Sequence, residues 1–148
     1  MVMRLNYLKL EIPSKSANEG LARIVVASLA AQLDPTIDEL NDVKTAVSEA
    51  VTNAVIHGYE GGEGMITLKA ELFKDEISVE VQDEGAGIED LEKAREPLFT
   101  TKPEEERSGM GFTIMENFMD AVEVVSEPNL GTRVKMRKIF KSVQSSGD

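Results

Sequence analysis

The sequence predicts an α+β fold, a two-layer sandwich in which helices cover one face of a mixed, mostly antiparallel sheet. Three observations lead to this prediction. Short stretches that alternate apolar and polar residues occur near both ends of the chain. Two longer segments with apolar residues at helical spacing lie between the first such stretch and the others. Short turns separate the later stretches in pairs, and short turns favour antiparallel neighbours.

Five segments are expected to be strands because their apolar residues recur at every second position or fill the segment. They cover about residues 8–12, 65–73, 76–82, 122–126 and 132–139. Lys74-Asp75 and residues 128–131 have the composition of tight turns. Residues 60–64, with three glycines, form a flexible connection before the second strand.

Helix starts are marked by two pairs of residues with capping-box spacing. Ser16 and Glu19 predict a helix that runs to about Leu33, and Thr36 and Glu39 predict a second one. Apolar residues at helical spacing continue through this second segment, and a glycine at position 58 is a plausible stop. A third helix is expected to start near residue 109.

Composition excludes several classes of function. The 148 residues include 27 acidic and 16 basic side chains, and a net charge of −11 opposes nonspecific binding to DNA or to anionic membranes. With no cysteine and one histidine, thiolate and multi-histidine metal sites are absent. No apolar stretch reaches the about 18 residues that span a bilayer, so a cytoplasmic protein is expected. A single domain over residues 1–140 and a disordered tail over 141–148 would account for the length.

Three elements carry the candidate chemistry. Glu49, Asn53 and His57 recur at every fourth position and so share one stripe of the second helix. Residues 83–88, which read DEGAGI, follow directly after an apolar strand, so that an aspartate and two glycines can approach a flat ligand. Residues 108–112, which read SGMGF, enter a helix whose N-terminal amides favour phosphate.

Each element also has a simpler explanation. The helix stripe can be the polar margin of an amphipathic helix, the second element an acidic turn, and the third a helix start without a ligand. The long segment between the two glycine elements contains Thr100, Thr101, Lys102 and Arg107, which suit phosphate oxygens. Neither a Walker A sequence nor the HRD and DFG elements of eukaryotic-type kinases are present.

Together, the three elements resemble the ATP-binding fold of gyrase, histidine kinases and MutL, the Bergerat or GHKL fold. Residues 48–54 are similar to its N box, residues 83–87 to its first glycine box, and residues 109–111 to its second. Nearly the whole chain further resembles the sporulation anti-sigma F factors. That likeness is clearest over residues 47–59 and 97–120.

The resemblance implies that ATP or ADP binds with Mg²⁺. It implies that Asp83 reads the adenine amino group with Thr132 nearby, that Asn53 supplies one oxygen to Mg²⁺, and that Glu49 orients or deprotonates a substrate hydroxyl. The other nucleotide contacts are expected from Gly85, Gly87, Thr100, Thr101, Lys102, Arg107, Ser108, Gly109, Met110 and Gly111.

The resemblance also implies partners. The protein would be a homodimeric serine kinase that inhibits sigma factor F in its ATP form and phosphorylates a serine of an anti-anti-sigma factor. Arg23 would contact both partners, although an exposed helix arginine explains this residue equally well without the family. The first strand and helix would form the dimer, or simply belong to the core.

Three rival functions remain to be compared with this one. They are a stress-response anti-sigma kinase of the same family, a non-catalytic ATP-dependent binding module, and the catalytic domain of a histidine kinase. The last of these needs a separate pair of phosphoacceptor helices, for which this chain has no room.

Overall fold

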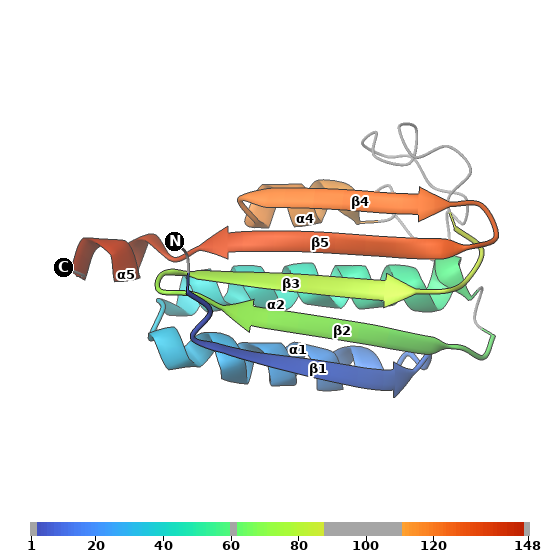
Figure 1. The fold of residues 1–148 in the computed structure, drawn as a ribbon, viewed down its shortest axis with the longest axis horizontal. Coiled ribbons are helices and arrows are strands. Elements are labelled where there is room, and N and C mark those ends of the chain that lie inside the picture. The colour runs from blue at the N-terminus through green and yellow to red at the C-terminus, as the bar shows by residue number, and fades with distance from the viewer. Residues whose placement is uncertain (1–2, 60–61, 88–110, 147–148) are drawn as a thin grey trace.

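The computed structural model describes residues 3–59, 62–87 and 111–146 (Figure 1). The chain begins with strand β1, the helices α1 and α2, and two short helical turns, η1 and η2. Strands β2 and β3, helix α4, strands β4 and β5, and helix α5 follow. Their bounds are β1 Asn6–Pro13, α1 Asn18–Ala30, η1 Ala31–Leu33, α2 Ile37–Asn53, η2 Ala54–Gly58, β2 Met65–Leu72, β3 Glu76–Asp83, α4 Phe112–Phe118, β4 Ala121–Glu127, β5 Gly131–Ile139 and α5 Lys141–Ser146.

The five strands form one sheet in the order β1-β2-β3-β5-β4, and all four pairings are antiparallel. The expectation of a mixed sheet was therefore wrong for the described strands. The physical reason lies in the connection from β1 to β2. A single crossover helix would return the chain to make a parallel pair, whereas the two helices α1 and α2 bring β2 back antiparallel to β1.

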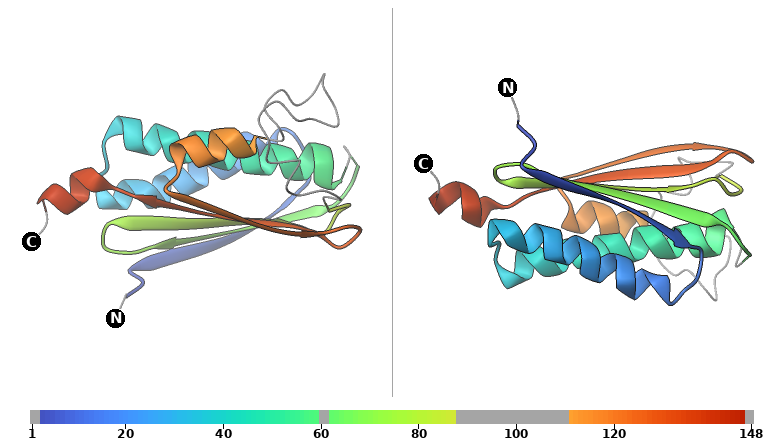
Figure 2. Two further views of the ribbon diagram at one scale, coloured as in Figure 1. Left: turned by 90° about the horizontal axis from the view of Figure 1, so that it is seen from above. Right: turned by 60° about the horizontal axis from the view of Figure 1, so that its bottom comes forward.

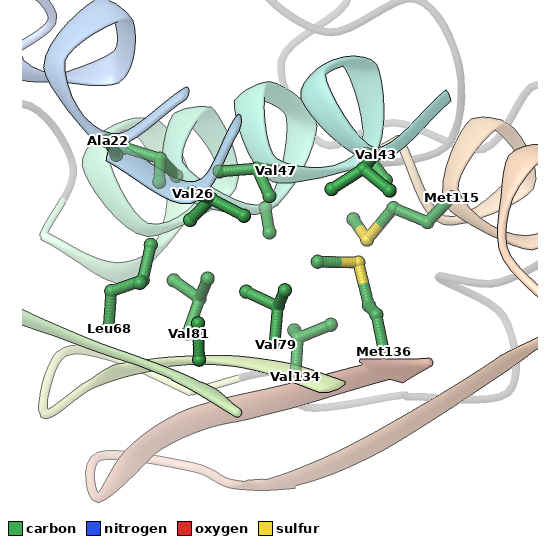
Figure 3. Packing of buried hydrophobic residues seen from close by; sticks show 14 of the residues in the cluster. Ala22, Val26, Val43, Val47, Leu68, Val79, Val81, Met115, Val134 and Met136 are labelled. Atoms are coloured by element: carbon green, nitrogen blue, oxygen red, sulfur yellow. The ribbon is translucent and has the colours of Figure 1, made fainter. Parts of the chain in front are cut away.

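The helices α1, α2 and α4 cover one face of the sheet, as predicted (Figure 2). The core lies between the two layers, where side chains of α1 and α2 meet the inward-facing residues of β2, β3 and β5 (Figure 3). Met115 of α4 and Met136 of β5 face each other at one end of this core and are fully buried. The opposite face of the sheet carries a row of charged side chains in register: Lys9, Lys69, Glu80, Lys135 and Glu123.

Of the two predicted capping boxes, only the second forms. The side chain of Thr36 accepts a hydrogen bond from the Glu39 amide, and the Glu39 carboxylate accepts one from the Thr36 amide. Helix α1 instead starts after Ala17, which has helical backbone angles and no side-chain cap. Ser16 lies one residue too early and contributes only its carbonyl oxygen, 3.2 Å from the Glu19 amide.

The C-terminal segment differs from the expected disordered tail, because residues 141–146 form α5. Phe140, which is fully buried, fixes the start of this helix. The amide and hydroxyl of Ser142 donate to the Glu39 carboxylate, and Gln144 Nε2 donates to Asp75 Oδ2 at 2.7 Å. These contacts explain why a polar sequence is ordered here.

The third predicted helix corresponds to α4. Its described part begins at Phe112, with Gly111 as the residue before it, and Gly109 lies outside the described residues. In the described parts of the chain, none of the helices has the length and apolar character needed to cross a bilayer.

A candidate nucleotide pocket at the end of α2

The C-terminal end of α2 and the turn η2 lie behind the end of β3 and the start of β5 (Figure 1). Residues of these elements line a pocket. It measures about 330 Å³ with its open mouth included, and little of this space is enclosed deeply enough to hold more than a water molecule. The lining residues are Ala50, Asn53, Ala54, His57, Gly58, Val81, Asp83, Gly87, Phe112, Thr132 and Val134.

The turn η2 shapes one wall of this pocket. After Asn53 the hydrogen bonding of α2 changes to the wider π-helical pattern, and the Tyr59 amide bonds to the Ala54 carbonyl at 3.1 Å. Single π-helical turns inside helices occur frequently at functional sites. The wider turn buries His57 and places Gly58 directly against Asp83.

Asp83 is the buried carboxylate of the pocket, with 6% of its surface exposed. Burial raises the pKa of Asp83, while hydrogen bonds from the backbone amides of Gly85 and Thr132 act in the opposite direction. The Gly85 amide lies 2.9 Å from Oδ1. A desolvated carboxylate held by two amides is a fixed acceptor, suited to an N–H donor such as an exocyclic amine.

Glycines make the close approach around Asp83 possible. A Cβ on Gly58 would lie 2.7 Å from both Cγ and Oδ1 of Asp83, and a Cβ on Gly85 would lie 1.9 Å from the Gly58 carbonyl oxygen. The Ala86 amide donates to that same carbonyl oxygen at 2.6 Å. The glycine element after β3 is thus packed directly onto the end of α2, without side chains between the two backbones.

Glu49 and Asn53 lie one turn apart on α2. Asn53 is buried, with 7% exposed, and lines the pocket. Glu49 is half-buried and lies outside that lining, against the start of α4. A Cβ on Gly111, whose φ is +76°, would lie 2.4 Å from Glu49 Oε2. Asn53 therefore lies inside the pocket, and Glu49 lies beside Gly111 at the start of α4.

The donor set fits a nucleotide-bound Mg²⁺ better than a metal held by protein alone. No group of three or more potential ligands from His, Cys, Asp and Glu occurs in the described residues. Mg²⁺ in nucleotide sites commonly takes one or two protein oxygens and completes its octahedron with phosphates and water. The buried side-chain amide of Asn53 can supply one such oxygen.

Thr132, the first pocket residue of β5, is paired with a residue that the sequence did not single out. Its hydroxyl lies 2.8 Å from Ser126 Oγ, which also contacts the Gly131 carbonyl oxygen at 3.2 Å. Ser126 and Thr132 are directly opposite each other in the β4–β5 register. Ser126 therefore fixes the place of the Thr132 hydroxyl at the pocket.

Comparison with known proteins agrees with this geometry. The profile of the histidine kinase-like ATPase domain family matches residues 12–138. An anti-sigma F factor from Clostridium perfringens strain SM101 is 61% identical over 134 residues, covering 90% of this chain and 96% of the relative. One from Thermoanaerobacter sp. strain X514 is 61% identical over 137 residues, covering 93% and 96%. This chain belongs to the anti-sigma F factor family.

Solved structures show the same fold at low identity. The RsbU and RsbW domains of a Mycobacterium tuberculosis protein align with a TM-score of 0.66 and 18% identity, over 90% of this chain and 32% of that one. The catalytic domain of the histidine kinase ThkA aligns with a TM-score of 0.56 and 16% identity, over 92% and 97%. The anti-sigma F factor fold is thus that of a histidine kinase-like ATPase domain, and such a domain implies ATP as ligand.

The structure brings together most of the predicted site residues that it describes. Asn53, Asp83, Gly87 and Thr132 line the pocket, and Gly85 packs beneath it. Predictions for several phosphate contacts lie outside the described residues: Thr100, Thr101, Lys102, Arg107, Ser108, Gly109 and Met110.

Arg23 keeps 39% of its side-chain surface exposed, with Nη1 2.7 Å from Glu19 Oε1 and 3.4 Å from Ser48 Oγ. This placement is compatible with a partner contact and with an exposed helix arginine. Ser48 directly precedes Glu49 in the chain.

Sequence reasoning missed three residues of this site. Gly58 was read only as a helix stop, although its lack of a Cβ lets Asp83 approach. Phe112 stood at the end of the 108–112 element without a predicted role, and it lines the pocket. Ser126 carried no motif at all, and its position opposite Thr132 emerges only from the strand register.

Proposed function

We propose that this anti-sigma F factor is an ATP-dependent serine kinase that phosphorylates an anti-anti-sigma factor, and that its ATP form binds and inhibits sigma factor F. The observation that carries the kinase proposal is the combination of Asp83 and Asn53 inside one pocket with Glu49 beside its edge. A protein that only binds ATP has no evident need for the Glu49 carboxylate.

The base and the phosphates would be held by different parts of this site. Asp83 accepts a hydrogen bond from the adenine amino group, and Thr132 supports the base from the neighbouring strand. Asn53 provides one oxygen to Mg²⁺, an ion that supplies charge neutralisation to the phosphates when it is bound. The backbone at Gly111 precedes α4 and faces the phosphate side.

Glu49 supplies the acid–base chemistry. Its carboxylate is half-buried at the start of α4, one helical turn from Asn53. A serine hydroxyl that donates to this carboxylate is oriented for attack, and Glu49 accepts its proton as the new oxygen–phosphorus bond forms. The oxygen–phosphorus bond to the leaving ADP breaks in the same displacement.

The partner surfaces are proposed on α1. Arg23 is the candidate contact for both sigma factor F and the anti-anti-sigma factor, and it lies next to the residue that precedes Glu49. Leu21 and Ile24 of α1 leave 46% and 61% of their surfaces exposed, which suits a homodimer contact. A sigma-factor partner would place the protein in the cytoplasm.

The kinase proposal is tested by replacing Glu49 with alanine. Purified protein is mixed with ATP, Mg²⁺ and a candidate anti-anti-sigma protein, and phosphoserine is measured alongside ATP and sigma binding. We expect phosphorylation to fall about 10²–10⁴-fold, the range typical for loss of a general base. ATP and sigma binding should persist.

A matched control is Glu11→Ala, which removes an exposed carboxylate from β1. It should leave phosphorylation unchanged. Undiminished phosphorylation by the Glu49 variant would remove Glu49 from the mechanism and favour a different base.

A further inference from the structure

The chain has two tyrosines, and they lie in very different surroundings. Tyr7 is 61% exposed on β1, with the Arg4 guanidinium 3.9 Å from its ring centroid. Tyr59 directly follows the turn η2 and is half-buried. Its hydroxyl donates to the Met65 carbonyl oxygen at 2.6 Å and accepts a hydrogen bond from the Glu84 amide at 2.8 Å. One phenol thus joins the start of β2 to the segment that leaves β3.

The contact to Glu84 matters because Glu84 is the residue after Asp83. Consecutive amides of this segment have separate acceptors: Glu84 bonds to Tyr59, Gly85 to the Asp83 carboxylate, and Ala86 to the Gly58 carbonyl. Two of the three acceptors are Gly58, the last residue of η2, and Tyr59, the residue after it. The direction in which the chain leaves Asp83 is therefore fixed from that turn.

The ring of Tyr59 is itself tightly held. A Cβ on Gly64 would lie 2.3 Å from Cε1 of the ring, so the backbone at Gly64 passes directly over its face. The Gly62 amide donates to the Tyr59 carbonyl oxygen at 2.7 Å. A side chain packed in this way has few rotamers available, and its hydroxyl is a fixed point rather than a mobile one.

We propose that Tyr59 is a positioning residue for nucleotide recognition, which sets the Asp83 carboxylate at the adenine through the Glu84 amide. The inference rests on the proposed function, because it assumes that Asp83 reads the base. Tyr59 acts on the base end of the pocket, away from Glu49. It therefore affects ATP and ADP equally and leaves the phosphoryl-transfer step unchanged.

The test is Tyr59→Phe, which removes the hydroxyl and keeps the ring, with Tyr7→Phe as the matched control. Calorimetry gives the Kd for ATP and ADP, and steady-state assays with the anti-anti-sigma protein give KM for ATP and kcat. Loss of the hydrogen bond from the Glu84 amide predicts that both Kd values and the KM rise about 3–10-fold in Tyr59→Phe. We expect the kcat of Tyr59→Phe at saturating ATP to match that of the unmodified protein. For the control Tyr7→Phe, we expect Kd, KM and kcat all to be unchanged.

A second variant, Gly64→Ala, displaces the ring while keeping the hydroxyl, and should raise both Kd values as well. If Tyr59→Phe lowers the unfolding temperature but leaves both Kd values unchanged, Tyr59 is merely structural and the inference is overturned. A fall in kcat at unchanged KM overturns it too. Absence of ATP binding by the unmodified protein would instead defeat the proposed function, and this inference with it.

Discussion

Replacing Gly58 with alanine tests how tightly η2 is packed onto Asp83. The added Cβ would lie 2.7 Å from Asp83 Cγ and Oδ1 and 2.9 Å from Oδ2, distances that real Cβ atoms essentially never show. The neighbouring group cannot yield easily, because the carboxylate accepts hydrogen bonds from the Gly85 and Thr132 amides. Asp83 or the turn must therefore move.

The expected change in the free energy of unfolding combines one favourable and two unfavourable contributions. Alanine is favoured over glycine in a helical segment by about 0.5–1 kcal/mol. Overpacking a well-filled site costs about 1–3 kcal/mol, and weakening a hydrogen bond to a charged group adds about 1.5–3 kcal/mol. The unfavourable terms are larger, so we expect the free energy of unfolding to fall by about 1.5–5.5 kcal/mol.

The assay combines urea denaturation with calorimetric titration of ATP. If Asp83 reads the base as proposed, displacement of its carboxylate should weaken ATP binding about tenfold, equivalent to about 1.4 kcal/mol. Gly20→Ala in α1 is the matched control, because its Cβ would have Arg23 Nη2 as nearest neighbour at an ordinary 3.8 Å. That variant should be as stable as the parent or slightly more so, with unchanged ATP affinity.

The reasoning would be refuted if Gly58→Ala were at least as stable as the parent and bound ATP equally well. Such a result would mean that the close contact between Gly58 and Asp83 has no energetic consequence. Loss of ATP binding in Gly20→Ala would be equally damaging, since Arg23, the neighbour of that added Cβ among the described residues, does not line the pocket.

Two further predictions concern α1 and the capping box. Arg23→Ala should reduce capture of both sigma factor F and the anti-anti-sigma protein in pull-down assays while leaving the Kd for ATP unchanged; retention of both partners would end the contact proposal. For Glu39, burial acts to raise the pKa, but hydrogen bonds from Ser142 and Thr36 outweigh it and lower the pKa below 4.5. The stability from this carboxylate is therefore present above about pH 4.5 and is lost as the pH falls through the folded-state pKa. Between pH 7 and pH 3, the free energy of unfolding should fall less in Glu39→Gln than in the parent protein. Identical dependence on pH in the two proteins would contradict this reasoning.

The sequence was informative where local chemistry decides the structure. The capping box at Thr36 formed because its two side chains satisfy amides within one turn, and the alternating strands paired as their apolar faces require. The same spacing at Ser16 failed because the chain entered α1 one residue later, with the Asn18 side chain bonded to the Pro13 carbonyl oxygen. A motif of two residues does not determine which of several nearby hydrogen bonds will form.

The site was only partly predictable for a related reason. Asp83 and Asn53 were found because each stands inside a short recognisable pattern. Gly58, Ser126 and Tyr59 act through contacts with residues 25, 6 and 25 positions away, respectively. Such contacts depend on strand register and on the π-helical turn, and no periodicity in the sequence marks that turn.

The preference of the protein for ATP over GTP tests most directly the central claim that Asp83 recognises the adenine base. Adenine presents an amino donor where guanine presents a carbonyl acceptor, so a buried carboxylate should favour the first and repel the second. Calorimetry of the unmodified protein should show ATP bound more tightly than GTP, and Asp83→Asn should weaken ATP binding about 10–150-fold, the equivalent of about 1.5–3 kcal/mol. The Asp83→Asn substitution should also reduce the difference in affinity between ATP and GTP. Equal ATP affinity in both proteins, or an unchanged preference for ATP in Asp83→Asn, would contradict the account.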